Sequence, residues 1–213
     1  MISLLLDTSN QALSVAVNRN GKMLAEINTN YKKTHSETLV DNIQKVLSIA
    51  NIKKSDIDRI IVAKGPGSYT GVRIGITVAK MLAKQLNVPI YSVSSLFVLA
   101  VSNRGLGSIA PLIDARRAHV YGALYKIGED DYTEVIAPVY IEFDALSAKI
   151  DGAVYLLNSQ EKITIDLEEY THVTPRISET ERYEKALKLE DADQLVPDYL
   201  RISEAERNWQ NNQ

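Results

Sequence analysis

The residues of this sequence that could do chemistry lie in two short segments, each of which follows an apolar run. The first is the glycine-rich stretch 65–75 (GPGSYTGVRIG), which reads as a loop between a buried strand and a long helix. Such a loop can bring backbone N–H groups and a helix N-terminus to one point, which holds a phosphate. The second is Asp7-Thr8-Ser9, whose carboxylate and hydroxyls could hold a metal-bound phosphate. Together they predict a site of weak nucleotide affinity, made of Asp7, Thr8, Ser9, Gly65, Gly67 and Ser68.

The same two segments also fit a purely structural role. The spacing of Gly65, Gly67 and Gly71 is not G-x-G-x-x-G, and Val72 stands where a P-loop has a lysine. A polar turn after a strand and a tight turn into a crossover helix would explain both segments without a ligand. The sequence leaves these two interpretations open.

No group of residues predicts catalysis or a metal site. Cysteine is absent, and the three histidines, at positions 35, 119 and 172, are too far apart for a metal-ligand spacing. For an enzyme the sequence offers only Asp7, Asp114 and His35, with no motif that joins them. We therefore predict no catalytic residue and no metal ligand.

The helix predicted after the glycine loop, at about 71–86, has a wide apolar surface. At 100° per residue its polar side chains share one narrow face, and the apolar arc is about twice the ~100° that packing on one sheet requires. It is either a buried crossover helix or, with the predicted helix at about 35–50, a docking face. Small residues at every fourth position would let a partner backbone approach, so a bulky charge at Gly75 or Ala79 should abolish association and spare the fold. The predicted contact residues are Leu39, Ile43, Val46, Gly71, Ile74, Gly75, Val78, Ala79 and Leu82.

The remaining pattern predicts an α/β fold of two related lobes. Apolar runs at 2–6 and 13–17 indicate a strand hairpin. At an offset of 107 residues Leu6-Asp7 matches Ile113-Asp114, which indicates an internal duplication. A site would then lie in the cleft between the lobes. We place the lobes at residues 1–102 and 103–213, with the second reduced, a helix over Ser178–Leu189 and a fraying tail over 204–213.

Composition and charge narrow the class of protein. The 213 residues are 45% hydrophobic, which suits one large or two small globular domains. The net charge is −3 and the basic pairs Lys53-Lys54 and Arg116-Arg117 are isolated, which disfavours a stand-alone RNA-binding protein. No signal-peptide pattern or membrane span is indicated. We expect a cytoplasmic protein without a membrane partner, which the absence of cysteine fits.

Six blocks spread over nearly the whole chain resemble the signature blocks of the bacterial TsaB (YeaZ) family, in the same order. The resemblance implies an actin/Hsp70/sugar-kinase-like (ASKHA) fold with a reduced C-terminal lobe. It also implies a role in making the threonylcarbamoyladenosine modification beside the anticodon of tRNAs that read codons beginning with A. The blocks are LDTS at 6–9, HSE at 35–37, the glycine block at 65–75, VSSL at 93–96, DARR at 114–117 and PDYLR at 197–201.

The resemblance further implies a non-catalytic subunit that partners the transferase TsaD and works with the ATPase TsaE. TsaD-like relatives carry two metal-binding histidines at positions that correspond here to Ser95 and Leu99, and neither side chain suits a metal. We expect a heterodimer with TsaD, a homodimer when TsaD is absent, and contact with tRNA only through the complex. The chain itself is expected to require no cofactor. ATP or ADP with Mg²⁺ would bind weakly or at the partner interface.

A free-standing enzyme of the same superfamily is the alternative. It would be a small-molecule phosphotransferase or a glycoprotease-like peptidase, and it would need an acid, a base or a metal triad that converges on the cleft. Only Asp7, Asp114 and His35 could supply such groups.

Overall fold

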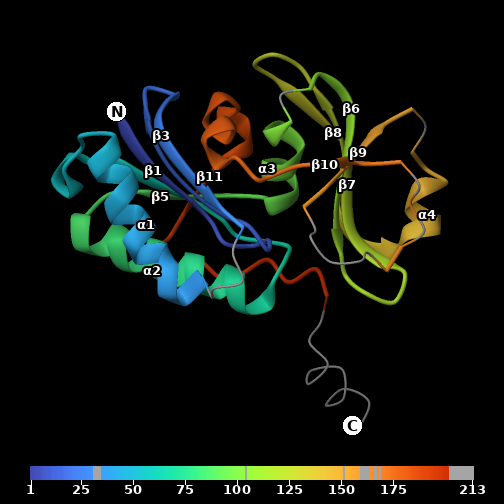
Figure 1. Cartoon of the computed structure of the whole chain (residues 1–213), viewed down its shortest axis with the longest axis horizontal. Coiled ribbons are helices and arrows are strands. Elements are labelled where there is room, and N and C mark those ends of the chain that lie inside the picture. Colours follow the sequence, from blue (N-terminus) through green and yellow to red (C-terminus); the bar gives the residue numbers. More distant parts are fainter. Residues whose placement is uncertain are drawn as a thin grey trace, which may run out of the picture.

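The computed structural model describes residues 1–30, 35–103, 105–150, 152–158, 164–165, 167 and 169–201. These residues form two β-sheets that stand side by side as two lobes (Figure 1). The first sheet has the strand order β11-β5-β4-β1-β2-β3, and the second has the order β10-β9-β6-β7-β8. The strands are β1 (Ile2–Asp7), β2 (Leu13–Arg19), β3 (Lys22–Thr29), β4 (Arg59–Ala63), β5 (Ile90–Val93), β6 (Gly107–Asp114), β7 (His119–Ile127), β8 (Tyr132–Glu142), β9 (Val154–Leu157), β10 (Thr171–His172) and β11 (Lys188–Glu190).

The two sheets share one topology, which confirms the predicted duplication. The order β5-β4-β1-β2-β3 matches β10-β9-β6-β7-β8 strand for strand. In each set the first two pairs are parallel and the last two are antiparallel. β1 ends at Asp7 and β6 ends at Asp114, the two acids that the offset of 107 relates. The second lobe is reduced in its helices, because α4 (Phe143–Ser147) has only five residues.

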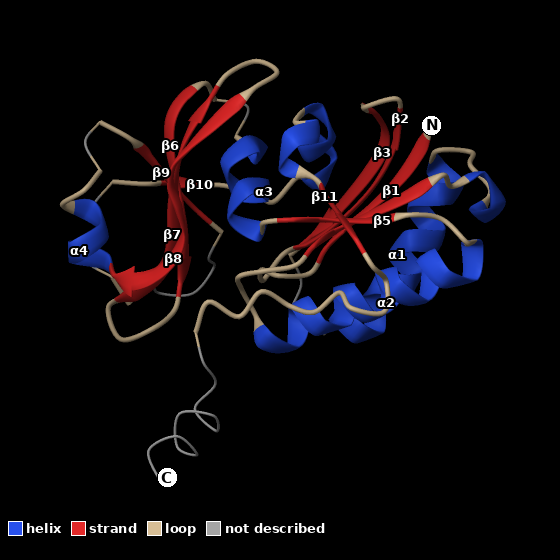
Figure 2. Cartoon of the chain, turned by 180° about the vertical axis from the view of Figure 1, so that it is seen from behind, coloured by secondary structure: helices blue, strands red, loops and turns tan. Residues whose placement is uncertain are grey.

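Helices cover both faces of the first sheet (Figure 2). On one face lie α1 (His35–Ile49) and α2 (Tyr69–Leu86). On the other lie α3 (Ser95–Ser102) and the 3₁₀ helix η2 (Ile177–Arg182). The predicted helices at 35–50 and 71–86 are therefore confirmed. Two further 3₁₀ turns are η1 (Lys54–Asp56) and η3 (Glu184–Ala186).

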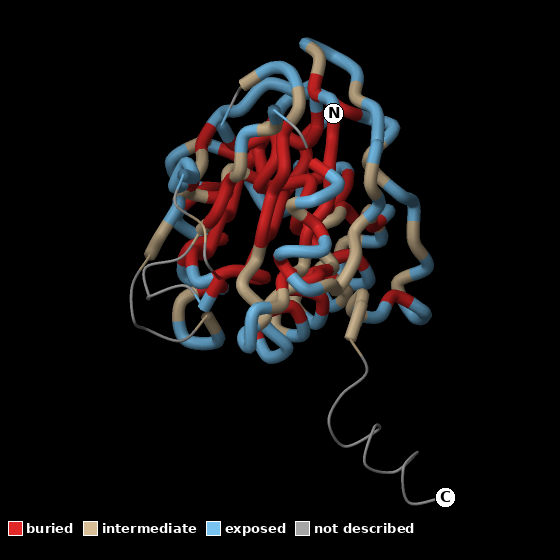
Figure 3. Tube along the Cα trace, turned by 90° about the vertical axis from the view of Figure 1, so that its right-hand side faces the viewer, coloured by how far each residue is buried: buried red, intermediate tan, exposed pale blue. Residues whose placement is uncertain are grey.

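The central strand β1 is buried from end to end because both faces of its sheet are covered (Figure 3). Leu4 and Leu6 belong to the core beneath α1 and α2, and Leu5 belongs to the core beneath α3. Successive side chains of a strand point to opposite faces, so a strand buried on both sides reads as a continuous apolar run. All three leucines have no exposed surface.

The segment after residue 176 differs from the sequence prediction. A single helix over Ser178–Leu189 is wrong, because the segment forms η2, η3 and then β11, which pairs antiparallel with β5 at the edge of the first sheet. The reason lies in tertiary contacts: Ile177 N donates to Ser14 Oγ, and Ser178 N donates to Glu26 Oε1. A 3₁₀ segment also advances farther per residue than an α-helix. This segment, which the sequence placed in the second lobe, thus packs on the first.

The segment Thr34-His35-Ser36-Glu37 fits a capping box, which predicts Thr34 as the N-cap of α1. Thr34 and the predicted tail, 204–213, both lie outside the described residues. The start of α2 is described, and Ser68 caps it with its Oγ, which accepts from Gly71 N at 3.2 Å.

Candidate functional site

The polar turn after β1 is closed by Asp7. Its Oδ1 accepts hydrogen bonds from Ser9 N at 2.8 Å and from Ser9 Oγ at 2.6 Å. Its Oδ2 is buried without a partner among the described residues. Burial raises the pKa of Asp7 above its ordinary value of 3.8 and outweighs the Ser9 hydrogen bonds, which lower it. Asp7 therefore serves first to fix the turn that carries Thr8 and Ser9.

The glycine loop lies directly against this turn, so the structure brings the two predicted segments together. Thr8 Oγ1 donates to Gly71 O at 2.7 Å, and Ser68 N donates to Ser9 O at 2.7 Å. A Cβ on Gly67 would lie 2.3 Å from Ser9 O, and one on Gly71 would lie 2.2 Å from Thr8 O. The glycines are needed because two backbones approach more closely than a side chain allows.

Three N–H groups of the loop donate hydrogen bonds inside the chain. Gly65 N donates to Ser95 Oγ at 3.1 Å, and the N–H groups of Ser68 and Gly71 are bonded as described above. The other side of Gly65, whose φ is +111°, is closed by Asp198, since a Cβ there would lie 2.9 Å from Asp198 O. A phosphate needs such donors to face it. The N–H groups of Gly65, Ser68 and Gly71 therefore support the packing interpretation of the loop, and the nucleotide site stays a prediction.

The three residues nominated for an enzyme do not form one site. Asp114 lies in the second lobe, where its carboxylate accepts from Thr164 N, Thr164 Oγ1 and Arg116 N, each at 2.7 Å. His35 lies on the first lobe, and its Nε2 is 2.9 Å from Asn10 O. Within the described part of the chain, no group of three or more histidine and carboxylate residues is placed to hold a metal.

Ser95 and Leu99, the positions that correspond to the histidines of TsaD-like relatives, both lie inside the protein. Neither has any exposed surface. Ser95 N donates to Gly65 O at 2.9 Å while its Oγ accepts from Gly65 N, and Leu99 packs in the core beneath α3. Both residues hold the glycine loop and α3 in place.

The predicted contact residues divide into two groups. Six of them are buried against the chain's own sheet, so their prediction as contact residues is wrong. The sequence shows how wide the apolar arc of α2 is, but not which part of it faces the sheet. The remaining three, Ile74, Val78 and Leu82, are half-buried at the margin of the core. The six buried residues are Leu39, Ile43, Val46, Gly71, Gly75 and Ala79.

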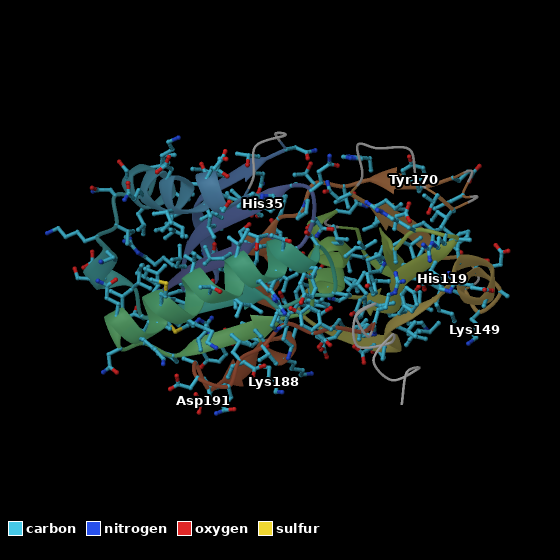
Figure 4. The ribbon with its side chains drawn as sticks, turned by 90° about the horizontal axis from the view of Figure 1, so that it is seen from below. His35, His119, Lys149, Tyr170, Lys188 and Asp191 are labelled. Carbon is cyan, nitrogen blue, oxygen red and sulfur yellow. The ribbon has the colours of Figure 1, made fainter. Side chains whose placement is uncertain are left out.

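An open groove of about 460 Å³ runs between the start of α1 and the outer side of α2. Its lining includes Ile74 and Val78, together with Ser36 of α1. One turn beyond Ser36, Val40 is 51% exposed, and one turn beyond Val78, Met81 is 66% exposed. In Figure 4, α2 runs along the near side of the first lobe, with His35 marking the start of α1 beside it. We call this surface, made of Ser36, Val40, Ile74, Val78 and Met81, the α1/α2 face.

Val40 and Met81 belong to this face although neither was among the predicted contact residues. The signal was present, because each is a large apolar residue whose helical neighbours three or four positions away line the groove.

No helix among the described residues is long and apolar enough to span a membrane.

Comparisons with known proteins agree with this fold. A family model described as "TsaD: tRNA N6-adenosine threonylcarbamoyltransferase" matches residues 22–172. The tRNA threonylcarbamoyladenosine biosynthesis protein TsaB of Bacillus subtilis (strain 168) is 37% identical over 225 residues and 98% of each chain. Its namesake of Escherichia coli (strain K12) is 33% identical over 60% of this chain and 56% of its own.

Two solved structures from Pseudomonas aeruginosa resemble nearly the whole chain. One is YeaZ, with a TM-score of 0.73 and 27% identity over 93% of this chain and 99% of its own. The other, an uncharacterized protein with similarity to peptidase YEAZ, has a TM-score of 0.75 and 26% identity over 94% and 99%. The two-lobed α/β structure is thus ASKHA-like, and the chain belongs to the TsaB (YeaZ) family, whose role is in tRNA threonylcarbamoyladenosine biosynthesis.

Proposed function

We propose that this chain is a non-catalytic subunit of the machinery that transfers the threonylcarbamoyl group to the adenosine beside the anticodon. It docks on a TsaD-type transferase through the α1/α2 face. The observation that carries this proposal is the outer apolar side of α2. Ile74 and Val78 are only half covered by the chain's own residues, and Met81 beyond them is 66% exposed. Covering such an exposed apolar strip with a second protein removes it from water, which is favourable in free energy.

The partner that fits this face best is another lobe of the same architecture. The family model that matches residues 22–172 is that of the transferase itself, so the two proteins have related lobes and related faces. When the transferase is absent, a second copy of this chain offers the same face, and a two-fold homodimer follows. TsaE acts on the assembled pair, which modifies the tRNA.

The chemistry belongs to the partner in this proposal. In this chain the polar groups after β1 and in the glycine loop form hydrogen bonds with one another. Asp7 Oδ1 accepts from Ser9 N and Ser9 Oγ, and Ser68 N donates to Ser9 O. Their geometry supports a rigid platform beneath α2 rather than a site that binds a reactant. The chain needs no cofactor of its own.

The alternative is a stand-alone enzyme, as the peptidase wording attached to one structural relative suggests for that protein. One observation favours a site near Asp7: its Oδ2 is buried without a described partner, and burial raises the pKa of Asp7 although nearby His35 lowers it. An enzyme would also need an activated nucleophile or water beside this pair.

Reconstitution tests the proposal. TsaD, TsaE, threonylcarbamoyl-adenylate and unmodified tRNA are incubated with and without this chain, and the nucleosides are measured by mass spectrometry. We expect modification only when the chain is present and no ATP or peptide turnover by the chain alone. Equal modification without it, or turnover by the chain alone, would refute the accessory role.

A further inference from the structure

The turn between β6 and β7 has an unusual backbone. Three successive residues that are not glycine, Arg116, Arg117 and Ala118, have φ values of 67°, 54° and 58°. This left-handed region is unfavourable for residues with a Cβ and is normally visited by single residues. A run of three persists only where surrounding contacts enforce it, and such strain is concentrated at sites with a function.

The contacts that enforce the turn come from the backbone and from Asp114. Arg116 N donates to Asp114 Oδ1 at 2.7 Å, and His119 N donates to Arg116 O at 3.1 Å. Ala115 N donates to His119 O at 2.9 Å, which closes the hairpin. Arg116 and Arg117 are exposed, so the turn presents two guanidinium groups at the surface of the second lobe.

Aromatic rings and a third arginine lie next to this turn. The ring of His119 stacks on Tyr140, with centroids 4.9 Å apart and planes 23° apart. The guanidinium of Arg201 lies over the same Tyr140 ring, 5.3 Å from its centroid. Figure 4 shows His119 on the underside of the second lobe. The Tyr140 ring thus links Arg201 of the PDYLR segment to His119, which lies two residues after the DARR segment; the docking proposal leaves both segments without a role.

The same surface continues onto the first lobe through Tyr199. Tyr199 lies two residues before Arg201, a span of at most about 7 Å. Its ring stacks on Tyr69 at 5.1 Å, and Arg73 lies over the Tyr69 ring at 4.1 Å while its Nε donates to Tyr199 OH at 2.5 Å. Arginines and tyrosine rings thus lie next to one another on both lobes, with Tyr69 and Tyr199 exposed and Tyr140 half-buried. We call this the arginine–tyrosine surface: Arg73, Arg116, Arg117, Tyr140, Tyr199 and Arg201.

These arginines differ from other described arginines of the chain, which pair with carboxylates. Arg59 and Arg176 each bind a carboxylate. Among the ion pairs between described residues, none involves the four arginines of the arginine–tyrosine surface. The net charge of the protein is −3, yet this surface carries four guanidinium groups that form no ion pair within the described part of the chain. Such a group is complementary to a polyanion.

We propose that the arginine–tyrosine surface contacts tRNA directly, with the arginines on phosphates and the rings beside unstacked bases. Guanidinium groups interleaved with aromatic rings suit a single-stranded, looped RNA, because phosphates and base faces are recognised together. An acidic protein segment would need the arginines but not the rings. The inference rests on the role in tRNA modification and goes beyond docking, since it gives this subunit its own RNA contact.

The test is binding of fluorescently labelled, unmodified tRNA to the full chain, followed by anisotropy at about 50 mM and about 200 mM salt. The variant is Arg116→Gln with Arg117→Gln, and the matched control is Lys53→Gln with Lys54→Gln. The control removes the same charge from an exposed pair on the first lobe. We expect the arginine variant to bind several-fold more weakly. The slope of log K against log salt should fall by roughly 1.5, for two lost phosphate contacts, and the control should match the wild type.

A second variant, Arg201→Gln, controls for a local folding defect of the turn in the Arg116/Arg117 variant. Arg201 lies outside the strained turn, and its replacement should also weaken tRNA binding. The inference is overturned if the wild type binds no tRNA at the lower salt, or if the two double variants bind tRNA with equal affinity. It is also overturned if polyglutamate displaces the labelled tRNA from the protein as effectively as unlabelled tRNA does. The last result would identify an acidic protein as the partner. The tRNA-binding assay contains no transferase. A chain that does not bind tRNA therefore leaves the docking proposal standing, and a chain that does not dock on the transferase leaves the tRNA-binding result valid.

Discussion

A Cβ placed on Gly75 would lie 2.3 Å from Thr8 Oγ1. That hydroxyl also donates to Gly71 O one turn earlier in α2. The row of small residues in α2 therefore lets the helix approach the turn after β1, and it faces inward. The consequence is that Gly75 is a packing residue of the first lobe, which reverses its predicted place in a partner interface.

Gly75→Ala should destabilise the isolated chain. The added methyl group would overlap Thr8 Oγ1, and overpacking of this kind costs about 1–3 kcal/mol in free energy of unfolding. Urea denaturation followed by circular dichroism measures the loss. Thr8→Ala in the same chain removes the overlapping hydroxyl, so the double variant should lose less than the sum of the two single variants. Strict additivity would contradict the close contact.

Val40→Asp with Met81→Asp should disrupt association and spare the fold. Both side chains are more than half exposed, so the free energy of unfolding should change by only about 0.5 kcal/mol. Two carboxylates buried in an apolar interface should weaken binding to the transferase at least tenfold, or about 1.4 kcal/mol. Light scattering and titration with the purified partner measure this effect.

Val135→Asp is the matched control for this docking prediction. Val135 is 47% exposed on β8 of the second lobe, away from the α1/α2 face. It should leave association unchanged. Unchanged association of the Val40/Met81 variant, or an equal loss in the control, would remove the α1/α2 face from the interface.

Arg59→Met should be strongly destabilising because it breaks a buried ion pair. Arg59 Nη2 donates to Glu181 Oε1 at 2.6 Å, and their side chains are 5% and 0% exposed. Removal of one partner of a buried pair costs about 3–5 kcal/mol, because the other charge stays buried alone. Thermal and urea unfolding measure the loss. Lys185→Met breaks the exposed pair with Asp131 and should cost less than about 1 kcal/mol. Equal effects would contradict this assignment.

Asp7→Asn should stabilise the chain at neutral pH. The amide oxygen of asparagine can accept both Ser9 hydrogen bonds that Asp7 Oδ1 now accepts. Burial raises the pKa of Asp7, so below about pH 3.8 the acid is neutral in both the folded and the unfolded chain and carries no penalty. As pH rises towards the folded pKa, ionisation favours the unfolded chain, and wild-type stability falls relative to the variant.

Denaturant unfolding of both proteins between about pH 4 and pH 7 checks this sign. The stability difference should grow with pH and favour the asparagine variant throughout. A variant that is less stable at neutral pH would show that the folded chain uses the carboxylate charge.

Calorimetry with Mg-ATP should give no heat from the glycine loop. The N–H groups of Gly65, Ser68 and Gly71 already donate within the chain, so a phosphate would have to displace those bonds. Saturable heat that is lost in Gly67→Ala would contradict the packing role of the loop and restore the predicted nucleotide site.

Local sequence patterns were sufficient for most elements of the first lobe. The unbroken apolar run in β1 indicated a strand buried on both faces, and the glycine block correctly marked the start of α2. The offset of 107 residues revealed the duplicated topology, since each lobe repeats the same strand, acid and hairpin. These features depend on residues close together in the chain, and side-chain periodicity reports them directly.

Tertiary structure alone decided how the surfaces are used. The wide apolar arc of α2 did not reveal that Gly71, Gly75 and Ala79 face the sheet, because helical periodicity has no absolute orientation. β8, with its exposed and polar residues, gave no clear alternation, and β11 forms only because residues 177–187 are held along the first sheet.

The arginine–tyrosine surface is the clearest case of this division. Arg116, Arg117 and Arg201 read as isolated basic residues in the sequence. The strained β6–β7 turn places Arg116 and Arg117 at the surface, and the chain after β11 brings Arg201 over Tyr140, the ring on which His119 stacks. Sequence determined the elements through local periodicity, whereas contacts between residues far apart in the chain decided which side chains meet, because only the folded chain sets those distances.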